Sequence, residues 1–259
     1  MEIWQAIVLG AVQGFSEFLP ISSSGHLILL QHWFGITEGV IFFSVMLHLG
    51  TLIPVVIVLW KEILSLFKKS FSKFWCLVLA TIPAGIVGLI FSKAIDLDAL
   101  FAEHIWLLGI TFLLTAGEMF FSEIRTKKVS LDNTINVKSS LIMGSGQALG
   151  VLPGLSRSGT TITFGTIAKV NTKDNANFTF LMSIPIILAA VLMQILDGIT
   201  GGGFGGIDFL PLAFGVITSV VTGYISIKFM LKIIKKANYK WFSLYLVLIA
   251  ISTFITAFV

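Results

Sequence analysis

Six long apolar runs constrain this chain more than any other feature of its sequence. They cover residues 41–60, 75–92, 105–122, 176–197, 208–231 and 241–259. Each run is long enough to cross about 30 Å of hydrocarbon as an α-helix. Hydrophobic residues make up 56% of the chain and charged residues 12%, about half the charged share of a soluble domain. The sequence therefore predicts an all-α integral membrane protein with six transmembrane helices.

Two further apolar segments are interrupted near their middles. Pro20 and the serines that follow it break residues 3–35, and Pro153-Gly154 and Gly159 break residues 139–168. Each half is too short to cross a bilayer. Because irregular backbone at membrane depth is tolerated only when it is buried in protein or lines a cavity, we expect two re-entrant helical hairpins.

The basic residues predict the orientation of these helices. Fifteen of the seventeen Lys and Arg residues fall in alternate connections between the spans. By the positive-inside rule these connections are cytoplasmic, which places both termini outside. The first hairpin then enters from outside and the second from inside. We attribute the net charge of +4 to this topology and expect no nucleic-acid partner.

A shift of 134 residues reveals an internal repeat. It pairs Gly10 with Gly144, Gln13 with Gln147, Ser22 with Ser156, Ser24 with Ser158, and Gly25 with Gly159. Each pair is weak alone, but the set fits an inverted-topology repeat with one hairpin and three spans in residues 1–122 and again in 139–259. Such folds place their binding site near the midplane, where the broken helices face each other.

Gln13 and Glu17 lie four residues apart, so they share one face of a helix. One interpretation is a buried Glu17 that only ties helices together. The other is a general base, or a ligand of a divalent cation to which Gln13 adds a carbonyl oxygen.

The run Ser22-Ser23-Ser24-Gly25-His26 opens the helix after Pro20. At least one of these hydroxyls is expected to cap that helix, and a helix N-terminus also attracts phosphate. A histidine in an apolar run is often a satisfied core residue, but the neighbouring hydroxyls favour a catalytic role for His26. The other histidines lack such neighbours and are interpreted as structural, with the one in the first span kept as a reserve candidate: His32, His48 and His104.

Arg157 supplies a positive charge within the second broken segment. A salt bridge with Glu17 alone would offset the cost of placing it at membrane depth. Ser156, Ser158 and Thr161 lie on the same short stretch and add hydroxyl groups. A guanidinium group, hydroxyls and a helix N-terminus together favour a phosphate site. Two such half-sites that face each other would suit a diphosphate.

The stretches Gln13–His26 and Pro153–Thr161 resemble the paired motifs of undecaprenyl-diphosphate phosphatases of the bacitracin-resistance type. The resemblance covers essentially the whole chain. It implies a bacterial inner-membrane enzyme that removes the terminal phosphate of undecaprenyl diphosphate and so recycles the lipid carrier of peptidoglycan synthesis. It also implies a site that opens to the outer, periplasmic face, a divalent cation such as Mg²⁺ or Ca²⁺, and in many members a homodimer.

Four residues match the family's active-site positions: Glu17, Ser23, His26 and Arg157. Around them the resemblance places Gln13, Ser156, Ser158 and Thr161. Together with Ser22, Ser24 and Gly25 at the helix start, the serines and Thr161 are the candidate phosphate-binding groups, and Gln13 and Glu17 are the candidate metal ligands. The family admits Glu or Gln at the position of Gln13, and the amide here lowers the expected metal affinity. Ser23 is the favoured nucleophile, while attack by a metal-activated water or by His26 stays open.

Two competing interpretations follow from the same motifs. The type 2 phosphatidate phosphatases also combine Ser-Gly-His with Ser-Arg, but they require a second histidine after the Ser-Arg element. No histidine follows His104 here, so that interpretation fails. A transporter or flippase for a polyprenyl phosphate remains the alternative, because inverted repeats are typical of transporters.

Overall fold

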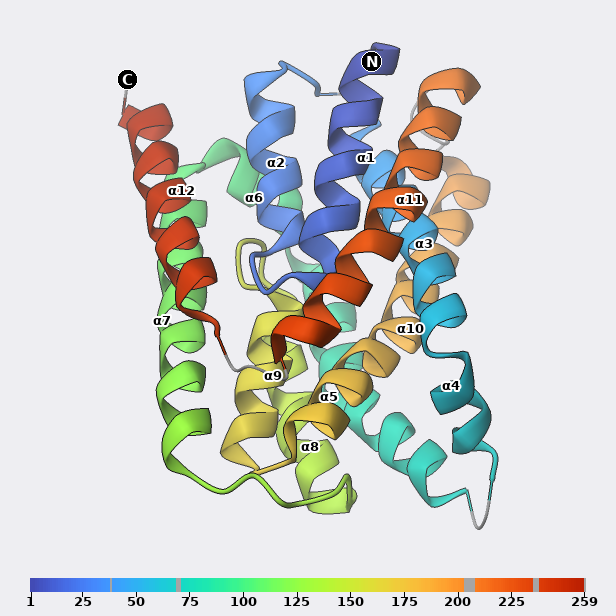
Figure 1. The fold of residues 1–259 in the computed structure, drawn as a ribbon. Helices are drawn as coiled ribbons and strands as arrows, with labels where there is room; N and C mark the ends of the chain where they lie inside the picture. Colours follow the sequence, from blue (N-terminus) through green and yellow to red (C-terminus); the bar gives the residue numbers. More distant parts are fainter. Residues whose placement is uncertain (38, 69–70, 203–207, 235–237, 259) are drawn as a thin grey trace.

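The computed structural model describes residues 1–37, 39–68, 71–202, 208–234 and 238–258. Within these ranges the chain is helical and contains no β-strand beyond one bridge between Asn133 and Val170. Figure 1 shows one bundle whose two termini lie at the same end, which we call the terminal end. The opposite end, where α7 leads into α8, carries Lys127, Lys128 and Lys138, and we call it the basic end.

Six helices in the described ranges are long and apolar enough to cross a membrane. They are α3 (Val40–Val58), α5 (Ser72–Ala94), α7 (Trp106–Lys128), α10 (Thr172–Asp197), α11 (Phe209–Ile234) and α12 (Lys240–Phe258). They confirm the six predicted spans in number and order. Their bounds differ from the predicted runs mainly where polar residues extend a helix, as at the end of α7 and the start of α10.

Three short elements were not predicted. The run expected as residues 41–60 ends as α3 at Val58, and a separate helix α4 (Trp60–Leu66) follows Leu59. Helix α6 (Leu97–Glu103) begins where the carboxylate of Asp96 accepts a hydrogen bond of 3.0 Å from the Ala99 amide. A π-helical turn, η1 (Gly198–Gly202), extends α10.

The two broken segments form helical pairs, α1 (Ile3–Phe18) with α2 (Ser23–Trp33) and α8 (Val137–Leu149) with α9 (Arg157–Ile167). Helix α1 ends because Leu19 is extended before Pro20, which disfavours helical backbone at the residue ahead of it. Figure 1 shows the first pair extending inward from the terminal end and the second from the basic end. Their turns meet where the Ser158 hydroxyl donates a hydrogen bond of 3.3 Å to the Leu19 carbonyl.

Small residues allow each first helix of a pair to pack closely on a long helix. A methyl group added at Gly10 of α1 would lie 2.2 Å from the carbonyl oxygen of Gly215 in α11. A methyl group at Gly144 of α8 would lie 2.5 Å from the carbonyl oxygen of Ala80 in α5. Both contacts join a broken segment to a helix of the other half of the chain, so the halves interlock.

The distribution of side chains is that of a protein surrounded by lipid. Large apolar side chains lie on the outer surface, such as Ile90 at 57% exposed and Leu248 at 58%. Polar side chains of α1 lie inside instead, with Gln13 at 0% and Glu17 at 4% exposed. In water, apolar side chains are more stable inside a protein and polar ones outside. These exposed apolar faces are therefore suited to contact with acyl chains.

Candidate active site

The first helical pair forms a buried acidic cluster at its turn. Gln13 and Glu17 lie one helical turn apart, and the Gln13 amide nitrogen Nε2 donates to Glu17 Oε2 at 3.0 Å. The Ser23 hydroxyl, on the first residue of α2, donates to the same oxygen at 2.8 Å. Ser23 is thus placed to pass its proton to Glu17.

The second pair brings the positive charge to this cluster. Arg157 is the first residue of α9, and its Nη2 pairs with Glu17 Oε1. The structure therefore brings Glu17, Ser23 and Arg157 together from two segments 134 residues apart, as the sequence predicts for a shared site. Arg157 Nη1 is buried and has no hydrogen-bond partner among the described residues, so the guanidinium keeps one donor group available.

His48, which the sequence interpretation kept as a reserve candidate, also lies at this cluster. Its Nε2 lies 3.5 Å from Glu17 Oε2, although it is 31 residues away in sequence. Its Nδ1 lies 2.7 Å from the Ser44 carbonyl, which can only accept, so Nδ1 carries a proton. The packing of α3 against α1 creates this contact, and its signal in the sequence was a histidine in a largely apolar span.

His26 points away from the acidic cluster. Its Nδ1 donates to the Ser22 carbonyl at 2.7 Å, which leaves Nε2 of the neutral ring to accept from the Tyr245 hydroxyl at 2.8 Å. The rings of His26 and Tyr245 are stacked. No hydrogen bond within the described ranges joins His26 to Ser23 or Glu17. Sequence reasoning missed Tyr245, which lies on the largely apolar helix α12.

The remaining hydroxyls mostly hold the two turns in shape. Ser22 accepts a hydrogen bond from the Gly25 amide at 3.3 Å, and Ser156 accepts one from the Gly159 amide at 3.1 Å. These two serines are the N-caps of α2 and α9. Thr161 donates back to the carbonyl of Arg157 at 2.7 Å.

Helices α2 and α9 both begin at the centre of the bundle, at the turns of the two pairs (Figure 1). Ser24 and Gly25 lie in the first turn of α2, and Ser158 lies in the first turn of α9. The first amides of a helix carry partial positive charge and lack intrahelical acceptors. Two such N-termini beside one guanidinium group are suited to a ligand with several anionic oxygens.

Gln13 and Glu17 can supply only some of the oxygen ligands that a hard cation needs. Gln13 Oε1 is buried and accepts no hydrogen bond from the described residues, and the Glu17 carboxylate lies beside it. No cluster of three or more His, Cys, Asp or Glu suited to a metal occurs in the described ranges. Mg²⁺ commonly takes one or two protein oxygens and completes its shell with water and substrate phosphate. Gln13 and Glu17 fit such a shared site.

Comparisons with known proteins show the family of this chain. The sequence model of the family described as bacitracin resistance protein BacA matches residues 6–252. The chain belongs to the BacA family.

Relatives in the BacA family are similar over almost their full length. The undecaprenyl-diphosphatase of Carboxydothermus hydrogenoformans is 36% identical, over 97% of this chain and 96% of its own. Those of Methanosphaera stadtmanae and Moorella thermoacetica are each 37% identical, over 100% and 96% of this chain and 99% and 96% of their own. Both motif stretches, Gln13–His26 and Pro153–Thr161, lie inside the region that matches the BacA family.

Proposed function

We infer that this chain is an undecaprenyl-diphosphatase, which converts undecaprenyl diphosphate and water to undecaprenyl phosphate and inorganic phosphate. Its BacA relatives carry that name. The observation that carries the inference is the meeting of Glu17, Ser23 and Arg157 at the N-termini of α2 and α9. A carboxylate, a hydroxyl and a guanidinium group are the parts that phosphoryl transfer requires.

The membrane arrangement is part of the proposal. The helical pairs α1–α2 and α8–α9 are re-entrant hairpins, and residues 1–122 and 139–259 are inverted repeats. Matching contacts support this. The Ser22 and Ser24 hydroxyls lie 3.5 Å apart, and those of Ser156 and Ser158 lie 3.2 Å apart. Each first serine also accepts from an amide three residues on, as an N-cap does.

The orientation follows from charge. The basic end is cytoplasmic by the positive-inside rule, so both termini lie outside. The resemblance to the family adds the bacterial inner membrane and a site that opens toward the outer, periplasmic face. Homodimerisation stays a prediction from the resemblance.

In the proposed reaction, the diphosphate displaces Glu17 from Arg157, and the guanidinium binds the transferred phosphoryl group. The Ser23 oxygen attacks the terminal phosphorus and passes its proton to Glu17 Oε2, along the hydrogen bond of 2.8 Å. Polyprenyl monophosphate leaves, and water then hydrolyses the phosphoserine. Because His26 Nε2 faces Tyr245, this geometry favours Ser23 over His26 as the nucleophile.

A bound Mg²⁺ or Ca²⁺ would neutralise charge on the phosphate oxygens during transfer. Gln13 Oε1 and Glu17 would hold it once Arg157 has turned to the substrate. His48 lies on the other side of Glu17 and would keep the carboxylate in place after Arg157 leaves.

Phosphate release from farnesyl diphosphate by detergent-solubilised protein tests the function, because a transporter without phosphatase activity releases none. We expect release by the wild type, its loss with chelator, and its loss in Ser23→Ala. The His26→Ala variant separates the nucleophiles. Residual turnover in His26→Ala with none in Ser23→Ala supports Ser23, and the reverse result supports His26. Absence of phosphate release by the wild type with either metal would overturn the proposal.

A further inference from the structure

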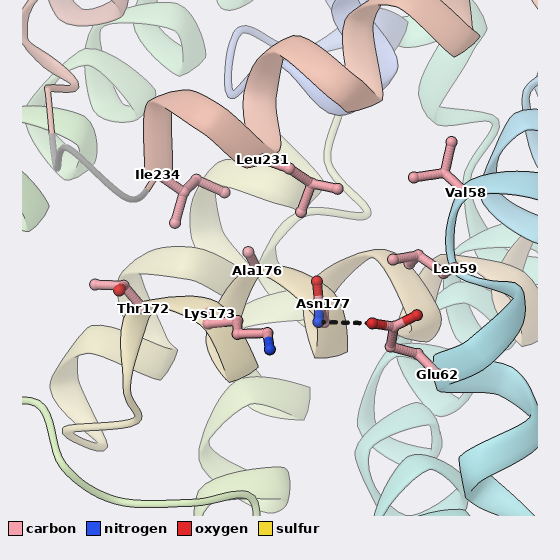
Figure 2. Close-up of a pocket in the computed structure, with 9 residues that line it drawn as sticks. All are labelled: Val58, Leu59, Glu62, Thr172, Lys173, Ala176, Asn177, Leu231 and Ile234. Atoms are coloured by element: carbon pink, nitrogen blue, oxygen red, sulfur yellow. Dashed lines mark hydrogen bonds between the residues drawn. The ribbon is translucent and has the colours of Figure 1, made fainter.

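Two pockets lie toward opposite ends of the bundle, outside the acidic cluster. The outer pocket, toward the terminal end, has a volume of about 540 Å³ and is formed by α2, the start of α3 and α6. The inner pocket, toward the basic end, has a volume of about 190 Å³ and is formed by the end of α3, α4, the start of α10 and the end of α11. Figure 2 shows the inner pocket.

The two pockets are built from matching positions of the repeat. Adding 135 to five residues of the outer pocket gives five residues of the inner pocket. The pairs are Thr37 with Thr172, Ile41 with Ala176, Phe42 with Asn177, Asp96 with Leu231, and Ala99 with Ile234. Subtracting 135 from Gln194 of the outer pocket gives Leu59 of the inner pocket. Six of the nine inner lining residues are thus counterparts of outer lining residues.

The two pockets differ in how they connect to Glu17. From the outer pocket, Gln31 donates to the Ser44 hydroxyl at 3.2 Å. The Ser44 backbone carbonyl accepts from His48, whose ring lies beside Glu17. From the inner pocket, Leu59 and Ala176 belong to an apolar cluster with Phe18 and Phe180. The Phe18 ring, adjacent to Glu17, packs edge-on against the Phe180 ring at 5.6 Å. The connection from the outer pocket to Glu17 is therefore made by polar groups, whereas the Phe18 and Phe180 rings separate the inner pocket from Glu17.

One hydrogen bond crosses the inner pocket. The Asn177 side chain on α10 donates to the Glu62 carboxylate on α4 at 3.4 Å (Figure 2). At the matching position of the outer pocket the chain has Phe42, whose ring carries no amide donor. The bond therefore holds α4 against α10 on the inner side.

We propose that the inner pocket is a second mouth of the active site, closed in this conformation, and that the Asn177–Glu62 bond is its latch. When the latch opens, the inner half takes the shape of the outer half, and the outer half takes that of the inner. Inverted repeats commonly exchange access to one central site in this way. The inference rests on the proposed repeat and orientation.

Because both mouths would serve one site, the ligand of the inner mouth is the same lipid diphosphate headgroup, presented from the cytoplasmic leaflet. Lys173 and Glu62 are the charged residues that line this pocket. The site would thus receive substrate from both leaflets, including a polyprenyl diphosphate released by a reaction that joins prenyl units on the cytoplasmic side.

The matched pair Thr37 and Thr172 allows a direct test by cysteine labelling. Each threonine is changed to Cys in a Cys76→Ala background, which removes the one native thiol. Each full-length variant is then labelled in sealed vesicles of known orientation. A membrane-impermeant maleimide is added from the basic side for Thr172→Cys and from the terminal side for Thr37→Cys. In proteins that keep Asn177 and Glu62, we expect fast labelling at position 37 and slow labelling at position 172.

Three latch variants make the test specific. Asn177→Asp places two carboxylates together and opens the latch, whereas Glu62→Gln keeps an acceptor for Asn177 and serves as the control. The double variant Glu62→Gln/Asn177→Asp reverses donor and acceptor and restores the bond. For Asn177→Asp we expect labelling at position 172 to rise roughly sevenfold and labelling at position 37 to fall by about a third, as a tenfold shift from about 5% inward-open predicts.

The reciprocal change is decisive. A fall at position 37 that accompanies the rise at position 172, and is reversed by the double variant, supports alternating mouths. A rise at position 172 with unchanged labelling at position 37 means only local loosening of α4 and overturns the proposal, as does failure of the double variant to restore the starting rates. Because labelling requires no turnover, these outcomes are independent of whether the phosphatase assignment is correct.

Discussion

At the scale of single residues, the Glu17–Arg157 pair determines whether the site functions. We expect Arg157→Ala to lower kcat/KM for a polyprenyl diphosphate by at least ~1,000-fold, since guanidinium groups that stabilise the transferred phosphoryl group contribute about that much or more. Phosphate release by purified protein measures it. Arg125→Ala is the matched control, because Arg125 contacts the Thr166 carbonyl and the Phe121 ring instead and should leave turnover near the wild-type value.

The same substitution also leaves a buried carboxylate without its main partner, which costs about 3–5 kcal/mol in such pairs. We therefore expect Arg157→Ala to lower the melting temperature and Glu17→Gln/Arg157→Ala to recover it without recovering activity. Thermal unfolding in detergent separates these effects. Wild-type-like phosphate release by Arg157→Ala would refute the assignment of Arg157 to the site.

The residues of this site could be predicted from the sequence where a charged side chain lies within an apolar segment. Glu17 and Arg157 were identifiable because a charge in an apolar segment needs a partner or a function. His48 was identified only as a reserve candidate and Tyr245 was missed, because each lies on a long, largely apolar span and its role depends on the helix that packs beside it. The orientation of the His26 ring could not be predicted either, because rotation about two side-chain bonds can turn the ring to either side of α2.

At the scale of helices, close packing of the broken segments on the long helices stabilises the bundle. We expect Gly10→Ala to destabilise the protein by about 1–3 kcal/mol, because its methyl group would lie 2.2 Å from the Gly215 carbonyl oxygen and neither backbone can move freely. Gly144→Ala, which faces the Ala80 carbonyl at 2.5 Å, should have a similar effect. Denaturant or thermal unfolding in detergent measures both.

Helix α5 offers the control for these glycines. Gly85 and Gly88 have no atom within 4 Å of an added methyl group, so Gly85→Ala and Gly88→Ala should be neutral or stabilise the helix by up to about 1 kcal/mol. Equal destabilisation by all four substitutions would indicate that helix flexibility, rather than contact with α5 and α11, is what the glycines supply.

Element prediction succeeded where one physical rule dominated. Long apolar runs predicted the spans, and Pro20 with its serines and Pro153-Gly154 predicted the interruptions, so the six long helices and the two pairs followed. The short helices α4 and α6 did not, because their start depends on local backbone angles at Leu59 and a cap at Asp96 in sequences of mixed polarity. The extended ends of α7 and α10 were missed since lysines and asparagines continue a helix beyond the apolar part.

At the scale of the whole molecule, the two halves of the sequence are interleaved rather than side by side. Helix α1 of the first half packs on α11 of the second more extensively than on its own partner α2, and α8 of the second half packs on α5 of the first. The sequence predicted that the halves would be related, from matching glycines and serines. It could not predict which helices of one half pack against the other half, because every long span is apolar on most of its surface.

This interleaving leads to a prediction for a divided chain. A cut between Ser130 and Leu131 falls in the connection from α7 to α8 and leaves Asn133 with the second half, where it exchanges backbone hydrogen bonds with Lys169 and Asn171. Fragments 1–130 and 131–259, expressed together, should associate in the membrane and release phosphate from a polyprenyl diphosphate. Neither fragment should do so alone, because Glu17 and Ser23 lie on one and Arg157 lies on the other.

Co-purification through a tag on one fragment and phosphate release by the purified pair measure the two parts of this prediction. A pair whose second fragment carries Arg157→Ala is the control, and it should associate but stay inactive. Activity in fragment 1–130 alone would place the whole reaction in one half and contradict a shared site. Failure of intact fragments to associate would show that the glycine contacts of α1 with α11 and of α8 with α5 form only when the connection is covalent.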